Sequence, residues 1–276
     1  MNLFKRYLRN PAAIIGLALL LLVILGALGA DFAFPRNPLS LAGRPLQWPG
    51  DNARFLFGTD QVGRDIAAQI LHGARVSLAI GLVATVIAAC IGVVIGALAG
   101  FYGGWADDVL MRVTEAFQIL PNFLLLLVLV AVFGSEIQTV VLSIGLVSWP
   151  PVARLTRSEF LTLRQREFVQ AARSLGVGDF KLIFREILPN ALPPVIVYAS
   201  VIMAVAILLE SALAFLNLSD PNVPSWGNLI GAGRGVIRVQ WYVSAIPGVA
   251  ILVTVLGISL VGQGLNDALN PRLHRS

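Results

Sequence analysis

Six long apolar runs constrain the fold of this 276-residue chain more than any other feature. Each run contains 17 to 25 residues with few or no charges, and a helix needs about 20 such residues to cross the hydrocarbon layer of a bilayer. Charged residues make up only 13% of the chain, against about 25% in soluble domains. Because lipid tolerates only backbone that is hydrogen-bonded within the segment, we expect an all-α polytopic membrane protein.

The apolar runs predict six transmembrane helices. They cover Ala12–Ala30, Val76–Gly100, Val109–Phe133, Ile137–Ala153, Leu192–Leu216 and Val243–Val261. The fourth is short and is expected to end at Pro150-Pro151, because a proline removes a helical hydrogen bond. The basic residues before the first run also fit a signal peptide. That run is longer than the usual signal core and the rest of the chain is membranous, so we favour an uncleaved anchor.

An even number of spans places both termini on one side of the membrane. Thirteen of the 20 Lys and Arg residues then fall on that side, seven of them between Trp149 and Leu188. Cytoplasmic loops retain Lys and Arg, so the pattern predicts an N-in/C-in topology. The net charge of +5 is explained by this bias, and we expect no nucleic-acid partner.

The span order divides the chain into three parts. Residues 1–72 are expected to form an anchor helix and a long extracytoplasmic loop, residues 73–265 the main membrane domain with the other five spans, and residues 266–276 a cytoplasmic tail. The polar pieces left between the spans are too short to fold as catalytic domains.

Several chemistries are excluded by what the chain lacks. Its only lysines are Lys5 and Lys181, and no G-x-x-x-x-G-K-[ST] loop is present, so it cannot bind ATP in the P-loop manner. Cys90 is the single cysteine, which excludes a disulfide within the chain. His72 and His274 fall on opposite sides of the membrane in this topology. We therefore expect no enzymatic activity, no metal site and no cofactor in this chain.

The polar segment between the fourth and fifth runs has its own helical pattern. Phe168, Ala171, Ala172 and Leu175 recur at i, i+3, i+4 and i+7, which places them on one helical face. Gly176 suits the left-handed residue that ends a helix. The small alanines favour docking of a partner protein over an amphipathic helix lying on lipid headgroups, which usually carries bulkier apolar residues.

Glycines at 92, 96 and 100 recur every four residues along the second span. Such a stripe lets helix backbones approach closely. The contact could lie within this chain or with a second subunit, or the stripe could simply reflect the glycine content of membrane helices.

A few polar residues lie in or beside the spans. Glu210 is an acid well inside an apolar run, and an intramembrane carboxylate is a functional candidate by default. We favour a structural or gating role for it, with water entering from the nearby outer end. Gln118 and Asn122, one turn apart on the third span, could line a translocation path or bond across helices. Asp60, Arg64, Asp65 and Trp226 are candidates for docking an external protein; the three charged residues could equally form a solvated turn.

The segment from Arg164 to Asn190 resembles the EAA loop of bacterial ABC-importer permeases. It shares the alanine pair, Gly176 after three intervening residues, and Leu188-Pro189. In that family the loop is the coupling helix that sits in a cleft of the cytoplasmic ATPase. Gln170 stands where the family usually has the leading Glu, and Glu167 lies one turn earlier. The resemblance thus implies an ATPase-coupling loop built on Glu167, Gln170, Ala171, Ala172, Gly176, Leu188 and Pro189, with Pro189 breaking the helix before the fifth span.

Three further blocks are similar to segments of the oligopeptide/dipeptide/nickel permeases. Permeases of that family work in pairs, and these blocks resemble the C-type member of the pair. They are FGTDQVGRDIAAQILHGARVSL from Phe57, FYGGWADDVLMR from Phe101 and PSWGNLI from Pro224.

The resemblance implies a bacterial inner-membrane importer subunit with the type I permease fold. Its implied partners are a second permease, two ATPase subunits that bind ATP and Mg²⁺, and an extracytoplasmic solute-binding protein. The implied cargo is a short peptide, with a nickel chelate or a glutathione-like solute as alternatives. An alternative of another class is a membrane scaffold that does not transport.

Overall fold

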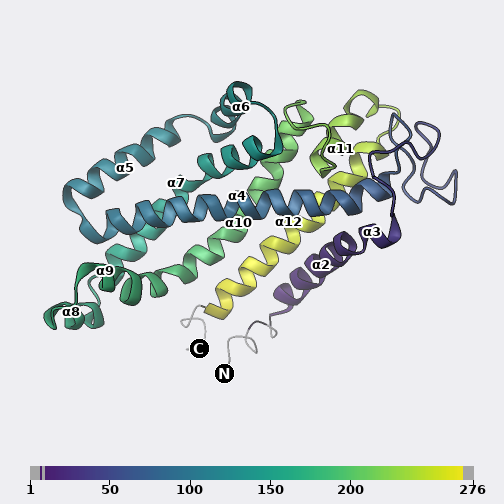
Figure 1. Ribbon diagram of the computed structural model, residues 1–276. Helices are drawn as coiled ribbons and strands as arrows, with labels where there is room; N and C mark the ends of the chain where they lie inside the picture. The colour runs from purple at the N-terminus through teal and green to yellow at the C-terminus, as the bar shows by residue number, and fades with distance from the viewer. Residues whose placement is uncertain (1–6, 8–9, 270–276) are drawn as a thin grey trace.

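The computed structural model describes Tyr7 and residues 10–269, and the described chain is built from helices (Figure 1). An isolated bridge between Thr59 and Asp65 is the one β-type pairing there, so the predicted all-α fold is confirmed. The basic residues Lys5, Arg6 and Arg9, and most of the predicted tail, including His274, lie outside the described residues.

The long helices are α2 (Pro11–Leu28), α4 (Ile66–Tyr102), α5 (Gly104–Ile119), α6 (Asn122–Phe133), α7 (Ile137–Leu163), α10 (Leu188–Phe215) and α12 (Tyr242–Leu269). Shorter elements are α3 (Ala30–Ala33), α8 (Glu167–Ser174), α9 (Asp179–Lys181), the π-helical turn Leu182–Ile187, α11 (Trp226–Gly233) and the 3-10 turn Arg234–Val236. The predicted domain boundaries at 72/73 and 265/266 both fall inside helices, α4 and α12, and the division remains a prediction.

Five helices are long and apolar enough to cross a membrane, and six spans result when α5 and α6 count as one. This pair is bent by 82°, so the third span is not the straight helix that the apolar run predicted. Leu120 is extended (ψ 136°) before Pro121, because a proline disfavours the helical conformation of the residue before it.

Helix α7 does not end at Pro150-Pro151 as predicted but continues to Leu163. Its buried residues in this region, among them Trp149 and Val152, pack against α4. This packing compensates for the hydrogen bonds that two prolines remove.

Pro189 does not break the chain before the fifth span either. It is the second residue of α10, which follows the π-helical turn directly. The N–H groups in the first turn of a helix have no acceptor within the helix. A proline, which has no N–H, therefore fits there without strain. Helical structure therefore runs from Asp179 to Phe215.

The glycine stripe of α4 packs against α7 of the same chain. A Cβ at Gly96 would collide with the Ala153 carbonyl and Thr156, and one at Gly100 would lie 2.6 Å from Phe160 Cβ. The close contact therefore joins two helices within this chain, and the stripe is not turned to a second subunit.

The anchor helix α2 packs along α12 through small residues. A Cβ at Gly16 would lie 2.6 Å from Leu260 Cβ, and Asn10 Nδ2 donates to Asp267 Oδ2 (2.7 Å). The start of α2 and the end of α12 therefore lie at the same end of the molecule, as an even number of spans requires.

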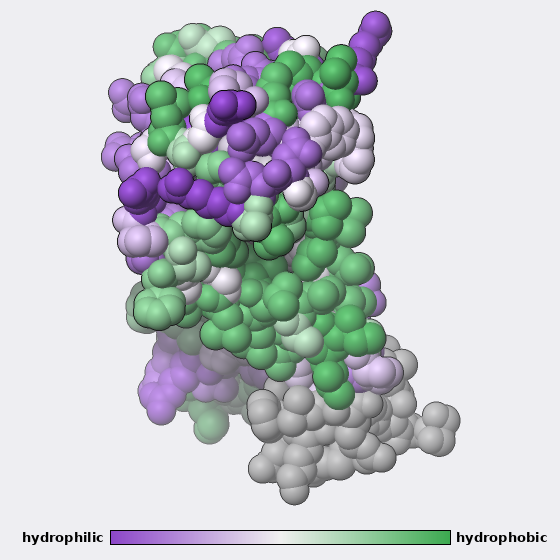
Figure 2. Space-filling view, turned by 90° about the vertical axis from the view of Figure 1, so that its right-hand side faces the viewer, coloured by the Kyte–Doolittle hydropathy of each residue, from purple (hydrophilic) through white to green (hydrophobic). Residues whose placement is uncertain are grey.

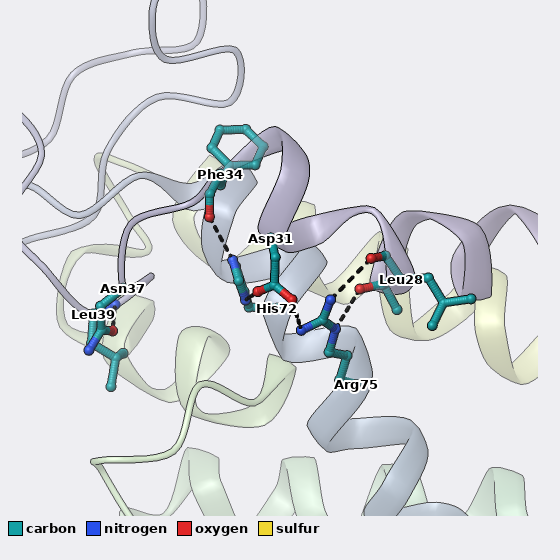
Figure 3. Close-up of polar contacts among 8 residues, drawn as sticks. Leu28, Asp31, Phe34, Asn37, Leu39, His72 and Arg75 are labelled. Carbon is teal, nitrogen blue, oxygen red and sulfur yellow. Dashed lines mark hydrogen bonds and ion pairs between the residues drawn. The ribbon is translucent and has the colours of Figure 1, made fainter.

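At its other end α2 is tied to α4 by Arg75 (Figure 3). The guanidinium donates to the carbonyls of Ala27 (2.6 Å) and Leu28 (3.1 Å) at the end of α2, and to the carboxylate of Asp31 (2.8 Å). His72, one turn earlier on α4, lies 3.0 Å from the Phe34 carbonyl oxygen. These contacts hold the anchor helix against the main bundle.

The two ends of the bundle carry different structures. Helices α8 and α9 lie at the end shared by the chain termini, whereas the loop of residues 34–65 and α11 lie at the other (Figure 1). Seen from the loop side, hydrophilic residues gather at the top and a hydrophobic surface lies below them (Figure 2). This alternation is the one expected of a chain that crosses a bilayer.

Candidate functional site

Helix α8 begins at Glu167 and ends in a glycine cap. The N–H of Gly176 donates to the Arg173 carbonyl (3.0 Å), and that of Val177 to the Ala172 carbonyl (3.1 Å). With φ of 78° at Gly176, this is a Schellman motif. The left-handed glycine predicted from the sequence therefore ends the helix.

The inner side of α8 packs into the molecule. Val169 is 2% exposed, and Ala172 lies against the same apolar cluster. That cluster is formed by residues of α4, α7, the π-helical turn and α10: Ala97, Phe101, Phe160, Leu182, Ile183, Ile187 and Ala191. Ala172 therefore faces its own chain, and the prediction that it shares an outward face with Ala171 is wrong.

Two arginines that the sequence argument did not single out fix α8 to the end of α4. Arg164 Nη1 donates to the carbonyls of Gly100 and Phe101, both at 3.2 Å, and a cation is favourable at a helix C-terminus. The Arg173 guanidinium lies 5.8 Å from the centroid of the Phe101 ring. Basic residues near a helix end were visible in the sequence, but their partners lie more than 60 residues away.

The outer side of α8 is exposed and mixed in character. We call it the coupling surface, and it consists of Glu167, Phe168, Gln170, Ala171 and Leu175. Gln170 Nε2 donates to the Arg164 carbonyl (3.0 Å), while Leu175 is 84% exposed. A short helix that is anchored on one side and exposes the large apolar side chains of Phe168 and Leu175 on the other is suited to a protein partner.

The coupling surface is joined rigidly to the fifth span. Only four residues, 175–178, separate α8 from the helical structure that begins at Asp179. Leu188 packs against the cluster that holds Val169, and Pro189 lies exposed at the start of α10.

Glu210 lies near the opposite end of α10 and is 1% exposed. Its Oε1 accepts a hydrogen bond from Ser225 Oγ (2.6 Å), and Ser211 Oγ lies 3.5 Å from Oε2. Ser225 Oγ also accepts from the Asn228 N–H (3.1 Å) and so caps α11. The prediction that water solvates Glu210 is wrong, because this carboxylate is enclosed by the segment that it holds in place.

Gln118 and Asn122 lie on different helices, on either side of the bend at Leu120-Pro121. They do not present neighbouring amides one turn apart on a single helix, as the straight span had predicted. A role in the translocation path remains a prediction for each residue separately.

The external candidates Asp60, Asp65 and Trp226 are buried, whereas Arg64 is half-buried. The Asp60 carboxylate accepts from the N–H of Arg64 (2.8 Å) and from Gln69 Nε2 (3.1 Å). Asp65 caps α4 by accepting from the Ala67 N–H (2.9 Å). Among the described residues none of the three charged side chains forms an ion pair with another, so the predicted charged turn is held by backbone hydrogen bonds.

Burial raises the pKa of the Asp65 carboxyl, while the amides of Ala67 and Ala68 and the charge of Arg54 oppose that shift. Trp226 is 1% exposed. Its N–H donates to Ser77 Oγ (3.1 Å), and its indole Nε1 donates to the Ile70 carbonyl (2.9 Å). In this conformation Asp60 and Trp226 are almost fully enclosed, and Asp65 is 9% exposed at the edge of a surface cavity.

Comparison with known families covers most of the chain. Residues 92–275 match the family described as binding-protein-dependent transport system inner membrane component. Residues 2–49 match the N-terminal TM domain of oligopeptide transport permease C. This chain is a binding-protein-dependent transport permease of the oligopeptide branch.

Full-length relatives of this permease support the assignment. It is 39% identical to the di/tripeptide transport system permease protein DppC of Pseudomonas aeruginosa, over 98% of this chain and 91% of that one. It is 35% identical to the glutathione transport system permease protein GsiD of Pectobacterium atrosepticum, over 98% and 90%.

The fold of the permease is also found in a solved transporter. A structure of the MetNI methionine ABC transporter in an inward-facing conformation matches 73% of this chain and 97% of its own, with a TM-score of 0.61 and 18% identity. The permease is therefore an inner-membrane component of a binding-protein-dependent transport system, and it has the fold of an ABC-transporter permease.

Proposed function

We propose that this permease is one half of a heterodimeric channel that imports short peptides. A solute-binding protein delivers the peptide outside, and two cytoplasmic ATPase subunits that bind ATP and Mg²⁺ drive its passage. The relatives named as peptide permeases support the cargo. The observation that carries the mechanism is the coupling surface, which is exposed on one side while Val169 anchors the other.

The attachment of α8 explains how a force on it would reach the membrane. Arg164 and Arg173 connect it to the end of α4, and the apolar cluster connects it to α7 and α10. When ATP closes the ATPase pair, α8 moves with the subunit that holds it. The fourth and fifth spans then rock with α8, because close-packed helices transmit displacement as rigid bodies.

The coupling surface is tested by replacing Ala171, which is exposed, with Trp. We expect uptake and co-purification of the ATPase subunits to fall at least tenfold, because a bulky ring prevents close docking. The control is Ser158→Trp, an exposed position on α7, which should leave both near wild type. Normal ATPase retention in Ala171→Trp would contradict docking through this surface.

Gly176→Pro tests the same helix through its cap. Proline cannot adopt φ of 78°, so α8 should lose its defined end. We expect loss of uptake and of the ATPase subunits while the permease remains in the membrane at normal amounts. Wild-type levels of both would argue against the proposal.

The cargo is a separate question from the coupling. The relative named as a glutathione permease makes a glutathione-like solute the second candidate cargo. A nickel chelate is the third. Thermal stabilisation of the cognate binding protein by peptide, glutathione or nickel chelate would distinguish these cargoes. A non-transporting scaffold would retain its partners but show no ATP-dependent uptake in proteoliposomes.

A further inference from the structure

The three extracytoplasmic connections of the chain meet around one cavity of about 330 Å³. Arg64 comes from the loop before α4 and Gln69 from its first turn, Ser135 from the α6–α7 connection, and Asn217 and Ser219 from the α10–α11 connection. Small-ligand sites of proteins have volumes of about this size. The cavity is placed at the outer mouth of the bundle, where a solute would enter.

Arg64 is the one charged residue lining this cavity. Its Nε is buried and has no hydrogen-bond partner in the part of the chain that the structure describes. Its guanidinium also forms no ion pair there within 4 Å. The side chain as a whole is half-buried and lines the cavity, so its guanidinium presents a positive charge that has no counter-charge there. Such a group favours an anionic ligand.

The nearest acids do not supply that acceptor. The Oδ2 atom of Asp60 already accepts a hydrogen bond from Gln69 Nε2 (3.1 Å). The Oε1 atom of Glu210 already accepts a hydrogen bond from the Ser225 hydroxyl (2.6 Å). Both carboxylates are buried, and neither lines the cavity. The polar groups that do line it include the hydroxyls of Ser135 and Ser219.

The walls of the cavity are fixed before any ligand enters. The Arg64 backbone is held on both sides by Asp60, whose N–H donates to the Arg64 carbonyl (3.0 Å) and whose carboxylate accepts from the Arg64 N–H (2.8 Å). Asn217 has φ of 60° in a second Schellman motif, where the Leu218 N–H donates to the Leu213 carbonyl (2.9 Å). Preorganised walls lower the entropic cost of binding.

We propose that this cavity binds the terminal carboxylate of the transported peptide, with Arg64 as its principal ligand. A guanidinium can hold both oxygens of a carboxylate through parallel hydrogen bonds. The neighbouring hydroxyls offer further donors, and the remaining space accommodates small side chains. This inference rests on the proposed peptide cargo, because it assigns a role to the carboxylate that every unmodified peptide carries.

Binding to the purified permease–ATPase complex in nanodiscs, without the binding protein, tests the site directly. The probes are trialanine and its C-terminal amide. We expect the wild-type complex to bind trialanine about tenfold more tightly than the amide, since an Arg–carboxylate interaction is worth at least that factor. Arg64→Gln should bind both equally weakly, and Arg64→Lys should restore part of the preference.

Arg44→Gln is the matched control, because Arg44 lies exposed in the same loop but does not line the cavity. It should keep the wild-type preference. All variants should elute as intact complexes, so that a lost preference is not a folding defect. An unchanged preference in Arg64→Gln, or equal binding of both probes by the wild type, would overturn the assignment.

Uptake into proteoliposomes with the binding protein separates this inference from the proposed function. Arg64→Gln should raise the KM for trialanine about tenfold, whereas the control Arg44→Gln should leave it unchanged. If the wild type imports no peptide but Arg64 still discriminates the two probes, the cargo is wrong and the carboxylate site stands. If import is normal and discrimination is absent, the site is wrong and the cargo stands.

Discussion

Single glycines set the distance between α4 and α7. At Gly96 the Ala153 carbonyl and Thr156 occupy the space that a side chain would need. We expect Gly96→Leu to destabilise the permease by about 1–3 kcal/mol, because backbone cannot move aside as a flexible side chain can. The measurement is the thermal unfolding of the purified protein in detergent, together with its yield in membranes.

Gly248 of α12 is the matched control for this residue. A Cβ there would have no atom within 4 Å, so Gly248→Leu should leave the unfolding temperature unchanged or raise it, since leucine is the better helix former. Equal loss of stability in the two variants would show that glycine flexibility, and not close packing, is what α4 requires.

An ion pair between Asp107 of α5 and Arg157 of α7 holds these two helices together. Arg157 Nε donates to Asp107 Oδ1 (2.5 Å) and Nη2 to Oδ2 (2.6 Å). We expect Asp107→Ala or Arg157→Ala alone to lower the free energy of unfolding by about 1.5–3 kcal/mol. The double variant should lose less than the sum, as a double-mutant cycle would measure.

Asp108→Ala serves as the control for the pair, since Asp108 is the exposed neighbour of Asp107 and forms no ion pair among the described residues. Its effect should stay within about 0.5 kcal/mol, as for other surface substitutions. Strict additivity of the two single effects would mean that the paired side chains do not hold α5 in place.

At the scale of the whole molecule, the topology predicts which residues each side of the membrane can reach. In a Cys90→Ala background, Arg166→Cys on the α8 side should react with an impermeant thiol reagent in inverted vesicles only. Gln61→Cys, exposed at the opposite end, should react in intact cells only. Labelling of the first variant in intact cells would reverse the orientation derived from the basic residues.

The sequence by itself determined the features that depend on local chemistry. Runs of about 20 apolar residues must become membrane helices, because no other backbone is satisfied in lipid. Gly176 ends α8 because left-handed backbone favours glycine over residues that carry a Cβ. The EAA-like spacing around it indicated an ABC-importer permease, and the blocks from Phe57, Phe101 and Pro224 indicated the oligopeptide branch, because each of these motifs lies within a short stretch of chain.

Only the tertiary structure decided features that depend on contacts between distant segments. Pro150 and Pro151 stay inside α7 because α4 packs beside them, whereas Pro121 is exposed and lies where its span bends by 82°. Ala172 turns inward while Ala171 does not, and Glu210 is enclosed by α11. A pattern within one helix cannot show which neighbour will cover it, because that depends on residues 15 to more than 60 positions away.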